Sequence, residues 1–278
     1  MRIHFLLARR VPPVPSPVCV EVYERLRDRG VAVDDSIPEE IQISTGELAV
    51  RHDLYVLKSH TEFALSVAGT LNVLGARLLN PHWSCLLTQD KITSTKLLAD
   101  AGVPVPPSWV TGDFDLLRPL LARSPLIAKP HRGHRGQGIH ILRGIQDVKD
   151  LCTTEGTFLF QQYLKADGED QKAYVVGEQV YAVRKRFSPT AFQHFGRPAE
   201  LDARTRDIVL TCGRVLGLHL YGVDLVVTAD GPFVVDVNYF PGYKGVPGAA
   251  ETIADYIYRY ASGRVQTARV QDGEPSHV

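Results

Sequence analysis

The sequence predicts a mixed α/β fold in three parts, and three patterns along the chain support that prediction. Apolar strands and helices alternate over residues 1–83, a glycine-rich loop separates two short strands within 84–157, and an apolar hairpin lies within 158–264. Alternation of strands and helices is typical of α/β domains. We therefore expect domains with these three ranges, followed by a flexible polar tail at 265–278.

An apolar run at residues 3–8 is expected to form the first buried strand of the N-terminal domain. The run is too short for a secretory signal or a membrane span, and Arg9 and Arg10 end it at once. Helical spacing of apolar residues stops later at Gly30 and again at Gly75. The domain is thus predicted to contain strands at 3–8 and 53–57 and helices at 19–29 and 61–74.

The same signals predict the elements of the other two domains. In the middle domain a helix at 90–101 precedes short strands at 126–129 and 139–142. In the last domain we expect strands at 158–164, 173–176, 179–184, 222–228 and 233–238, and helices at 201–216 and 251–261.

The composition narrows the classes of function. Hydrophobic residues make up 44% of the 278 residues, which is enough for a sizeable core. Lys and Arg equal Asp and Glu at 31 each, and this balance argues against bulk binding of nucleic acid. The four cysteines are isolated, without a C-x-x-C pair, so neither a disulfide framework nor a cysteine metal site is expected. We expect a soluble, cytoplasmic protein that binds no membrane, and the oligomeric state stays open.

A pair of carboxylates in the hairpin of the last domain suggests a metal site. A three-residue loop at 229–231, with Gly231 in the left-handed conformation, would place Asp224 directly opposite Asp236 and Asn238 on the same face. Two carboxylates about 5 Å apart repel unless a cation lies between them, and such oxygen ligands suit Mg²⁺. Alternatively, both Asp residues face solvent, or a two-residue turn shifts the register and separates them.

Basic residues suggest a phosphate site near these acids. Lys129 ends an apolar strand just before a loop whose glycines, Gly133, Gly136 and Gly138, could fold over phosphates. The loop is not a P-loop, because the G-K-[ST] ending is missing. A plain surface loop is the alternative.

A second set of basic side chains could form a cationic wall that faces the transferring phosphoryl group and an anionic substrate. It comprises Lys172, Arg184 and Arg186 on strands, with Lys58 and His60 at the end of the 53–57 strand. Ordinary solvated strand faces are the alternative. No Ser-His-Asp triad can be assembled, and no histidine pair has metal-ligand spacing on a helix.

Taken in order, these residues resemble the ATP-grasp superfamily over about residues 84–262. The resemblance lies in Asp90-Lys91, Leu97-Leu98 and the 102–106 segment GVPVP, in Lys129-Pro130 with its glycine loop, in the hinge 161–164 (QQYL), and in Asp224, Asp236 and Asn238. It implies an ATP-grasp fold preceded by an N-terminal α/β domain, with ATP and one or two Mg²⁺ ions (or Mn²⁺) between the second and third domains. It also implies site residues. Lys91, Lys129, Gly136 and Gly138 would hold phosphates, Gln162 and Leu164 adenine, and Asp170 ribose. Lys172, Arg184 and Arg186 would be catalytic.

Two branches of the superfamily resemble the chain. Inositol-phosphate 5/6-kinases resemble it in the 236–243 segment DVNYFPGY, in the 172–177 segment KAYVVG and near Ser188. Substrate contacts are expected at Ser188, Gly242 and Tyr243, and also at Lys58 and His60 from their place at the end of a strand. RimK-type carboxylate–amine ligases resemble it in the glycine loop and in Gly168-x-Asp170-x-Lys172. We expect an ATP-dependent enzyme acting on a small anionic substrate and favour the kinase, with a ligase working through an acyl phosphate as the alternative.

Overall fold

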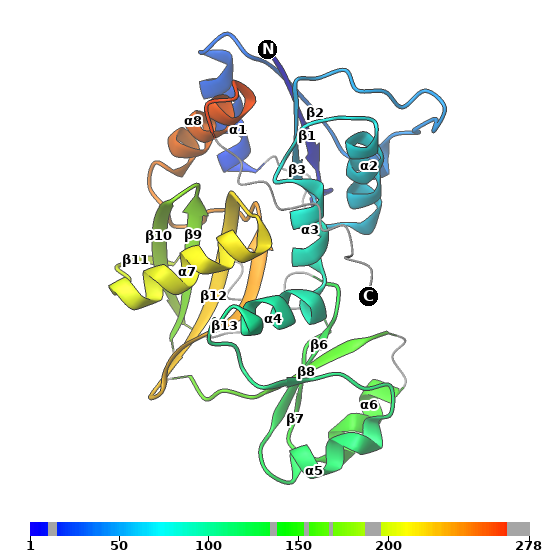
Figure 1. Cartoon of the computed structure of the whole chain (residues 1–278), viewed down its shortest axis with the longest axis vertical. Helices are drawn as coiled ribbons and strands as arrows, with labels where there is room; N and C mark the ends of the chain where they lie inside the picture. The colour runs from blue at the N-terminus through cyan, green and yellow to red at the C-terminus, as the bar shows by residue number, and fades with distance from the viewer. Residues whose placement is uncertain (11–15, 134–137, 153–155, 167–168, 187–195, 266–278) are drawn as a thin grey trace, which may run out of the picture.

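Three sheets make up the computed structural model, which describes residues 1–10, 16–133, 138–152, 156–166, 169–186 and 196–265. The N-terminal sheet and the third sheet along the chain lie side by side (Figure 1). The sheet between them in sequence, called the central sheet, lies at one end of the molecule. Within the described ranges, no helix is both long and apolar enough to cross a membrane. Cys19, Cys85 and Cys212 are buried free thiols.

The N-terminal sheet is parallel, with strand order β2-β1-β3-β4. Ile3 and Phe5 face one side and share a core cluster with helix α1, while Leu57 faces the other side and shares a cluster with helix α2. Both predicted strands and both predicted helices are confirmed. The elements are β1 Arg2–Leu7, α1 Pro17–Arg27, β2 Ala32–Ser36, the 3-10 turn Pro38–Glu40, β3 Leu54–Lys58, α2 Glu62–Val73 and β4 Leu78–Leu79.

The central sheet is antiparallel, with order β5-β8-β6-β7, and is reached through helices α3 and α4. One face packs Ala128 and Phe160 against the short helices of this subdomain. The elements are α3 His82–Gln89, α4 Lys91–Asp100, β5 Ser108–Trp109, the 3-10 turn Phe114–Leu117, α5 Arg118–Leu121, β6 Leu126–Pro130, β7 His140–Leu142, the 3-10 turn Ile145–Val148, α6 Lys149–Cys152 and β8 Phe158–Gln162.

Strand β8 corrects the predicted domain boundary. It pairs with β5 and β6 of the central sheet, so the boundary at residue 158 falls one strand too early. The apolar run 158–164 looked in sequence like the first strand of the last domain. Its residues 158–162 instead form an interior strand of the preceding sheet, with β5 paired on one side and β6 on the other.

The third sheet is antiparallel, with order β11-β10-β9-β12-β13. Helix α7 covers one face; Asp202 caps its N-terminus, and Gly217, with φ of 66°, ends it. Helix α8 packs beside α1 of the N-terminal subdomain (Figure 1). The elements are β9 Glu169–Val176, β10 Gln179–Arg186, β11 Arg197–Ala199, α7 Ala203–Leu216, β12 Leu220–Thr228, β13 Gly231–Tyr239 and α8 Ala249–Ala261. The predicted tail lies outside the described residues beyond Val265.

Candidate active site

Three oxygen-bearing side chains converge on one face of the β12–β13 hairpin. Asp224 of β12 lies directly opposite Asp236 of β13, as the sequence predicted. The Asn238 amide donates to Oδ2 of Asp236 at 3.1 Å and lies 3.4 Å from Oδ2 of Asp224. A half turn of that amide brings its oxygen into the same space. The three side chains therefore form one group, which we call the acidic group.

The hairpin reaches this pairing by a route that the sequence did not predict. Gly231 has a positive φ of 113°, as expected, but Thr228 pairs with Gly231, so only two residues lie between the paired ends. A two-residue turn alone would separate the acids. A register shift between Asp224 and Leu225 restores them to opposite positions, because Leu225 pairs with Val234 and Asp224 with Asp236.

Lys172, on β9, lies beside Asp224 on the side away from Asp236, because β12 stands between β9 and β13. The two residues are direct partners in the β9–β12 ladder, and Nζ lies 2.7 Å from Oδ1 and 2.9 Å from Oδ2 of Asp224. Burial by itself lowers the pKa of Lys172, but the attraction and hydrogen bond of Asp224, together with the charges of Tyr174 and Asp236, outweigh burial, so the net pKa is raised. The ammonium is therefore held charged beside the carboxylates, where an incoming phosphate would need it.

Lys129 brings the central sheet against the acidic group. Its side chain is 6% exposed, and Nζ donates to the backbone oxygen of Val235 at 2.9 Å. Burial lowers the pKa of Lys129, Asp236 opposes this shift, and repulsion from Lys91 adds to it. Lys91 donates from α4 to the backbone oxygen of Gly133 at 2.9 Å. Of the two predicted phosphate-binding lysines, Lys91 thus contacts Gly133, the last residue that the structure describes before 138, and Lys129 contacts β13.

A buried glutamine that the sequence reasoning passed over points to a nucleotide base. Gln161 is 2% exposed and its amide nitrogen contacts the Ser108 hydroxyl at 3.1 Å, whereas Oε1 has no partner among the described residues. Ile127 pairs with Gln161 and Lys129 with Leu159, so Gln161 and Lys129 share one face of the sheet. Unpaired buried acceptors are rare in native proteins, and an adenine amino group would satisfy this one.

Gln162, the residue chosen from sequence, does not share that face. It pairs with Leu126, whose side chain belongs to the core on the other side of the sheet, and its backbone nitrogen donates to Pro107 at 2.8 Å. The signal in the sequence was the alternation of Phe158 and Phe160, which assigns Gln162 to their face. Leu164 lies two residues past the end of β8.

The N-terminal subdomain closes the site beside Asn238. Lys58 donates to the backbone oxygens of Phe240 and Pro241, at 2.7 and 3.0 Å. The ring of His60 lies 4.1 Å from that of Tyr239, measured between centroids. Lys58 thus contacts the segment just after β13, whereas His60 stacks on Tyr239, whose side chain lies on the face of β13 opposite Asn238.

Two predicted site residues are not brought to the acidic group. Arg184 is exposed and pairs with Gln171, so strand alternation puts its side chain on the face opposite Lys172. The strand was predicted correctly, but the apolar pattern did not show which face Arg184 occupies. Tyr243 is 3% exposed and its hydroxyl donates to Val175 at 2.7 Å, which makes it a core residue rather than a substrate contact.

Other predicted positions are only partly described. Gly138 has φ of 70°, and a Cβ there would meet the Pro130 ring at 2.9 Å, so the loop end is shaped by glycine. Gly242 lies in the segment between β13 and α8. Gly136 and Ser188 lie outside the described residues, as do the side chains of Asp170 and Arg186.

The acidic group fits a divalent cation. Two carboxylates and an amide oxygen are the donors that Mg²⁺ prefers, and Mg²⁺ commonly takes its remaining ligands from water and substrate phosphates. Lys129, Lys172 and Lys91 surround the group with positive charge that suits those phosphates. The unpaired oxygen of Gln161 can accept a hydrogen bond from a base, and the three lysines can bind phosphates. Together with the acidic group, they define a site of the ATP-grasp class.

Comparisons with known proteins agree with this class. Residues 88–257, more than half of the chain, match the family model of the RimK-like ATP-grasp domain. A "Probable alpha-L-glutamate ligase" of Stenotrophomonas maltophilia is 33% identical over 210 residues, which cover 69% of this chain and 70% of the relative. A protein of the same name from Alkalilimnicola ehrlichii is 30% identical over 218 residues, which cover 73% of this chain and 72% of that relative. The chain belongs to the RimK-like ATP-grasp family.

Solved structures share the fold. A RimK domain ATP-grasp protein from Sphaerobacter thermophilus superimposes with a TM-score of 0.77 at 20% identity, over 92% of this chain and 99% of that one. A D-alanine–D-alanine ligase from Bacillus anthracis gives a TM-score of 0.68 at 19% identity, over 95% and 99%.

The expectation of an inositol- or polyol-phosphate kinase is not supported. The matched relatives are named as ligases, so the alternative expectation fits better. The segment 236–243 that suggested a kinase has a structural explanation here. Asp236 and Asn238 belong to the acidic group, whereas Phe240 and Tyr243 are buried in the core.

Proposed function

We propose that the chain is an ATP- and Mg²⁺-dependent carboxylate–amine ligase that forms an amide bond through an acyl phosphate. The observation that carries the proposal is the convergence of Asp224, Asp236 and Asn238 with Lys172 on one sheet face. Relatives named as alpha-L-glutamate ligases, which cover two thirds of the chain, favour the ligase over the kinase. They also make L-glutamate the first amine and carboxylate to test.

The chemistry needs positioning and charge rather than a protein nucleophile. A carboxylate oxygen of the substrate attacks the γ-phosphorus of ATP, the bond to the β-phosphate oxygen breaks, and ADP leaves. The amine nitrogen then attacks the acyl carbon, loses a proton, and expels inorganic phosphate. Mg²⁺ held by the acidic group would neutralise phosphate charge during the first step.

Each basic side chain has a distinct task in this proposal. Lys129 and Lys91 hold the phosphates of ATP, because Lys129 contacts β13 beside Asp236 and its pKa responds to the charges of both Lys91 and Asp236. Lys172 faces the γ-phosphoryl group, since it already contacts Asp224. Lys58 borders the space for a small anionic acceptor, since it contacts the segment that follows Asn238.

Oxygen transfer separates the ligase from a kinase. The protein is supplied with ATP, Mg²⁺ and L-glutamate whose carboxylates carry ¹⁸O, and phosphate and products are followed by mass spectrometry. We expect one ¹⁸O atom in the released phosphate and an amide-linked product. Phosphate retained on a stable phosphorylated product would contradict the ligase.

Asp236→Asn tests the acidic group within this assay. We expect turnover to fall by about 100-fold or more, because a charge that stabilises the transferring phosphoryl group is lost. Asp230→Asn, at the exposed tip of the same hairpin, is the matched control and should keep normal turnover. Equal activity in the two variants would remove the acidic group from the mechanism.

A further inference from the structure

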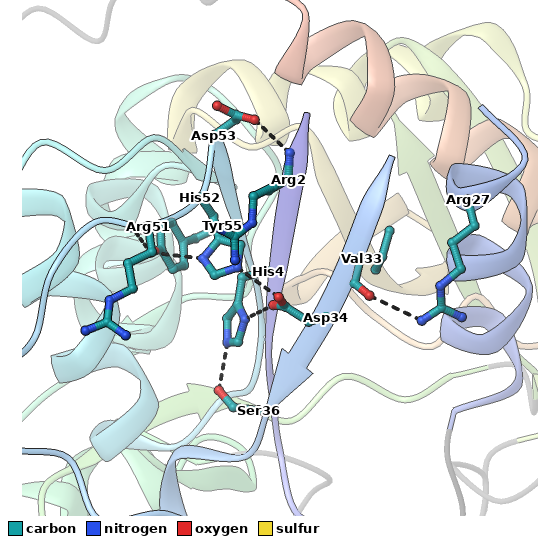
Figure 2. A network of polar contacts seen from close by, with 10 residues as sticks. All are labelled: Arg2, His4, Arg27, Val33, Asp34, Ser36, Arg51, His52, Asp53 and Tyr55. Atoms are coloured by element: carbon teal, nitrogen blue, oxygen red, sulfur yellow. Dashed lines mark hydrogen bonds and ion pairs between the residues drawn. The ribbon is translucent and has the colours of Figure 1, made fainter. Parts of the chain in front are cut away.

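A second cluster of ligand-type side chains lies in the N-terminal sheet, away from the acidic group. His4 is on β1, Asp34 on β2 and His52 just before β3 (Figure 2). His4 is the direct ladder partner of Asp34 on one side and of Tyr55 on the other. The register of three parallel strands therefore places the side chains of His4, Asp34 and Tyr55 on the same face, and His52 contacts both Asp34 and Tyr55.

The two imidazoles meet at one carboxylate. Nδ1 of His4 contacts Oδ1 of Asp34, and Nε2 of His52 lies 2.9 Å from Oδ2 of the same residue. One ligand atom from each of the three residues lies within 4.8 Å of the other two. Two nitrogens and an oxygen are thus gathered within a volume that one metal ion can span.

The outer nitrogen of each imidazole is also held. Nε2 of His4 lies 2.8 Å from the Ser36 hydroxyl, and Nδ1 of His52 lies 3.3 Å from the Tyr55 hydroxyl (Figure 2). In metal sites, a hydrogen bond from the outer N–H fixes the tautomer and aims the other nitrogen at the ion. Both hydroxyls can accept such a bond, so the cluster has an orienting partner for each histidine.

The exposure of the cluster suits an ion that enters from solvent. The side chains of His4 and His52 are 16% and 11% exposed, whereas that of Asp34 is 52% exposed. The imidazoles are therefore held by their surroundings, while the carboxylate keeps one side open to water.

From this geometry we propose that His4, Asp34 and His52 bind one divalent transition-metal ion, with Zn²⁺ as the ion that suits them best. Two imidazoles and one carboxylate leave a fourth tetrahedral position for water. Imidazole ligands select Zn²⁺ and its neighbours over Mg²⁺, which prefers oxygen alone. The ligation distinguishes this site chemically from the acidic group.

The position of the site indicates a stabilising role. The ion would tie β1, β2 and the segment before β3 together, where β2 is the edge of the sheet. Lys58 lies three residues further along β3 than Tyr55, so strand alternation gives it the other face. The ion would therefore not contact the acceptor space beside Lys58, and it acts independently of the proposed ligase chemistry.

Metal binding is measured on the full chain carrying Asp224→Asn and Asp236→Asn, so that the acidic group contributes nothing. After dialysis against a chelator, Co²⁺ is titrated by its visible spectrum and Zn²⁺ by calorimetry. We expect one equivalent of either ion to bind, and Zn²⁺ to raise the melting temperature because it binds the folded state. Absence of binding would overturn the proposal and leave a hydrogen-bonded His–Asp–His cluster.

Ligand variants made in the same background locate the ion. Asp34→Asn and His52→Gln should lose binding and the rise in melting temperature, while His140→Gln, on β7 of the central sheet, should keep both. Ser36→Ala leaves all three ligands in place and should weaken binding roughly 10- to 100-fold through the freed His4 ring. Undiminished binding in Asp34→Asn would place the ion elsewhere and overturn the proposal, as would lost binding in His140→Gln.

Discussion

At the scale of single residues, strand alternation decides which glutamine at the end of β8 can reach a nucleotide. Gln161 shares a face with Lys129 and has an unpaired buried Oε1, whereas Gln162 pairs with Leu126 and shares the face of the central core. The cost of that unpaired acceptor is recovered only when a donor arrives. Gln161 is therefore a residue kept for a ligand rather than for stability.

Gln161→Leu should raise the KM for ATP about fivefold, because a hydrogen bond of about 1 kcal/mol is lost. The melting temperature of the nucleotide-free protein should stay the same or rise, since the unpaired acceptor is removed and Ser108 keeps its bond to the Pro106 oxygen. Steady-state kinetics and thermal unfolding measure the two effects. Gln162→Leu is the matched control, and a larger rise in KM in that variant would reverse the assignment.

A buried histidine should make the protein sensitive to acid. Burial lowers the pKa of His219 to about 4 from 6.5, and its Nδ1 lies 2.8 Å from the Tyr256 hydroxyl on α8, which donates to the neutral ring. The unfolded chain therefore binds more protons than the folded one between these pH values. Stability should be lost as the pH falls from 6.5 to 4, by about 3 kcal/mol in total.

Urea denaturation at a series of pH values measures this loss. His219→Gln cannot take up the proton, so its stability should vary less with pH across the same window. His82, whose pKa burial also lowers, contributes a slope of the same sign in both proteins. Identical pH profiles for the two proteins would show that His219 does not titrate as described.

At the scale of elements, local pattern predicted the strands and helices well, but it could not predict how strands pair. Gly30, Gly75 and Gly217 ended helices within a residue or two of the predicted places. Strand β4 has only two residues, Leu78 and Leu79, which is too few to show a period, and the edge strand β2 is largely polar, so neither was predicted. The placement of β8 in the central sheet depends on partners distant in sequence, which no local signal contains.

The site residues divide in the same way into those that local pattern predicts and those that depend on strand pairing. Asp224, Asp236 and Asn238 were predicted because one hairpin holds all three, although a bulge rather than the loop sets their register. Arg184 was grouped with Lys172 because the sequence does not show which residues of β9 and β10 are partners, and this pairing puts the two side chains on opposite faces. The cluster of His4, Asp34 and His52 escaped the sequence analysis because its ligands stand 30 and 18 residues apart and meet only through parallel pairing.

The hairpin offers a test of which feature sets the register. Gly231→Ala places a Cβ at φ of 113°, with no atom within 4 Å of it, so the cost is conformational and about 1–2 kcal/mol. Activity should be largely kept, because the bulge beside Asp224 lies several residues from the turn. Gly46→Ala, which has equal space and no positive φ, should be close to neutral in denaturation. Loss of turnover in Gly231→Ala without loss of folding would show that the turn sets the register.

At the scale of the whole molecule, the first and third subdomains share their cores. One cluster contains Leu57 of β3 with Val223 of β12, and another contains Phe5 of β1 with Ile257 of α8. Lys58, which the proposed function assigns to the acceptor side of the site, meets the segment after β13 at this junction. The two subdomains should therefore unfold in one transition, and the acceptor space should be rigid compared with the nucleotide space.

Asn80 is a fully buried polar link across that junction, and its removal is the sharpest test of the shared core. The side chain is fully buried, donates to the Leu220 oxygen at 2.8 Å, and accepts from the nitrogens of His219 and Leu220 at 2.7 and 2.9 Å. Asn80→Ala leaves these backbone groups unpaired, which should cost about 2–4 kcal/mol. Asn72→Ala, at an exposed position on α2, should change stability little. Calorimetry should show the whole transition of Asn80→Ala moving to lower temperature as a single peak, because the two subdomains share their apolar clusters. A split into two peaks would mean that these subdomains fold independently and that Asn80 only docks them.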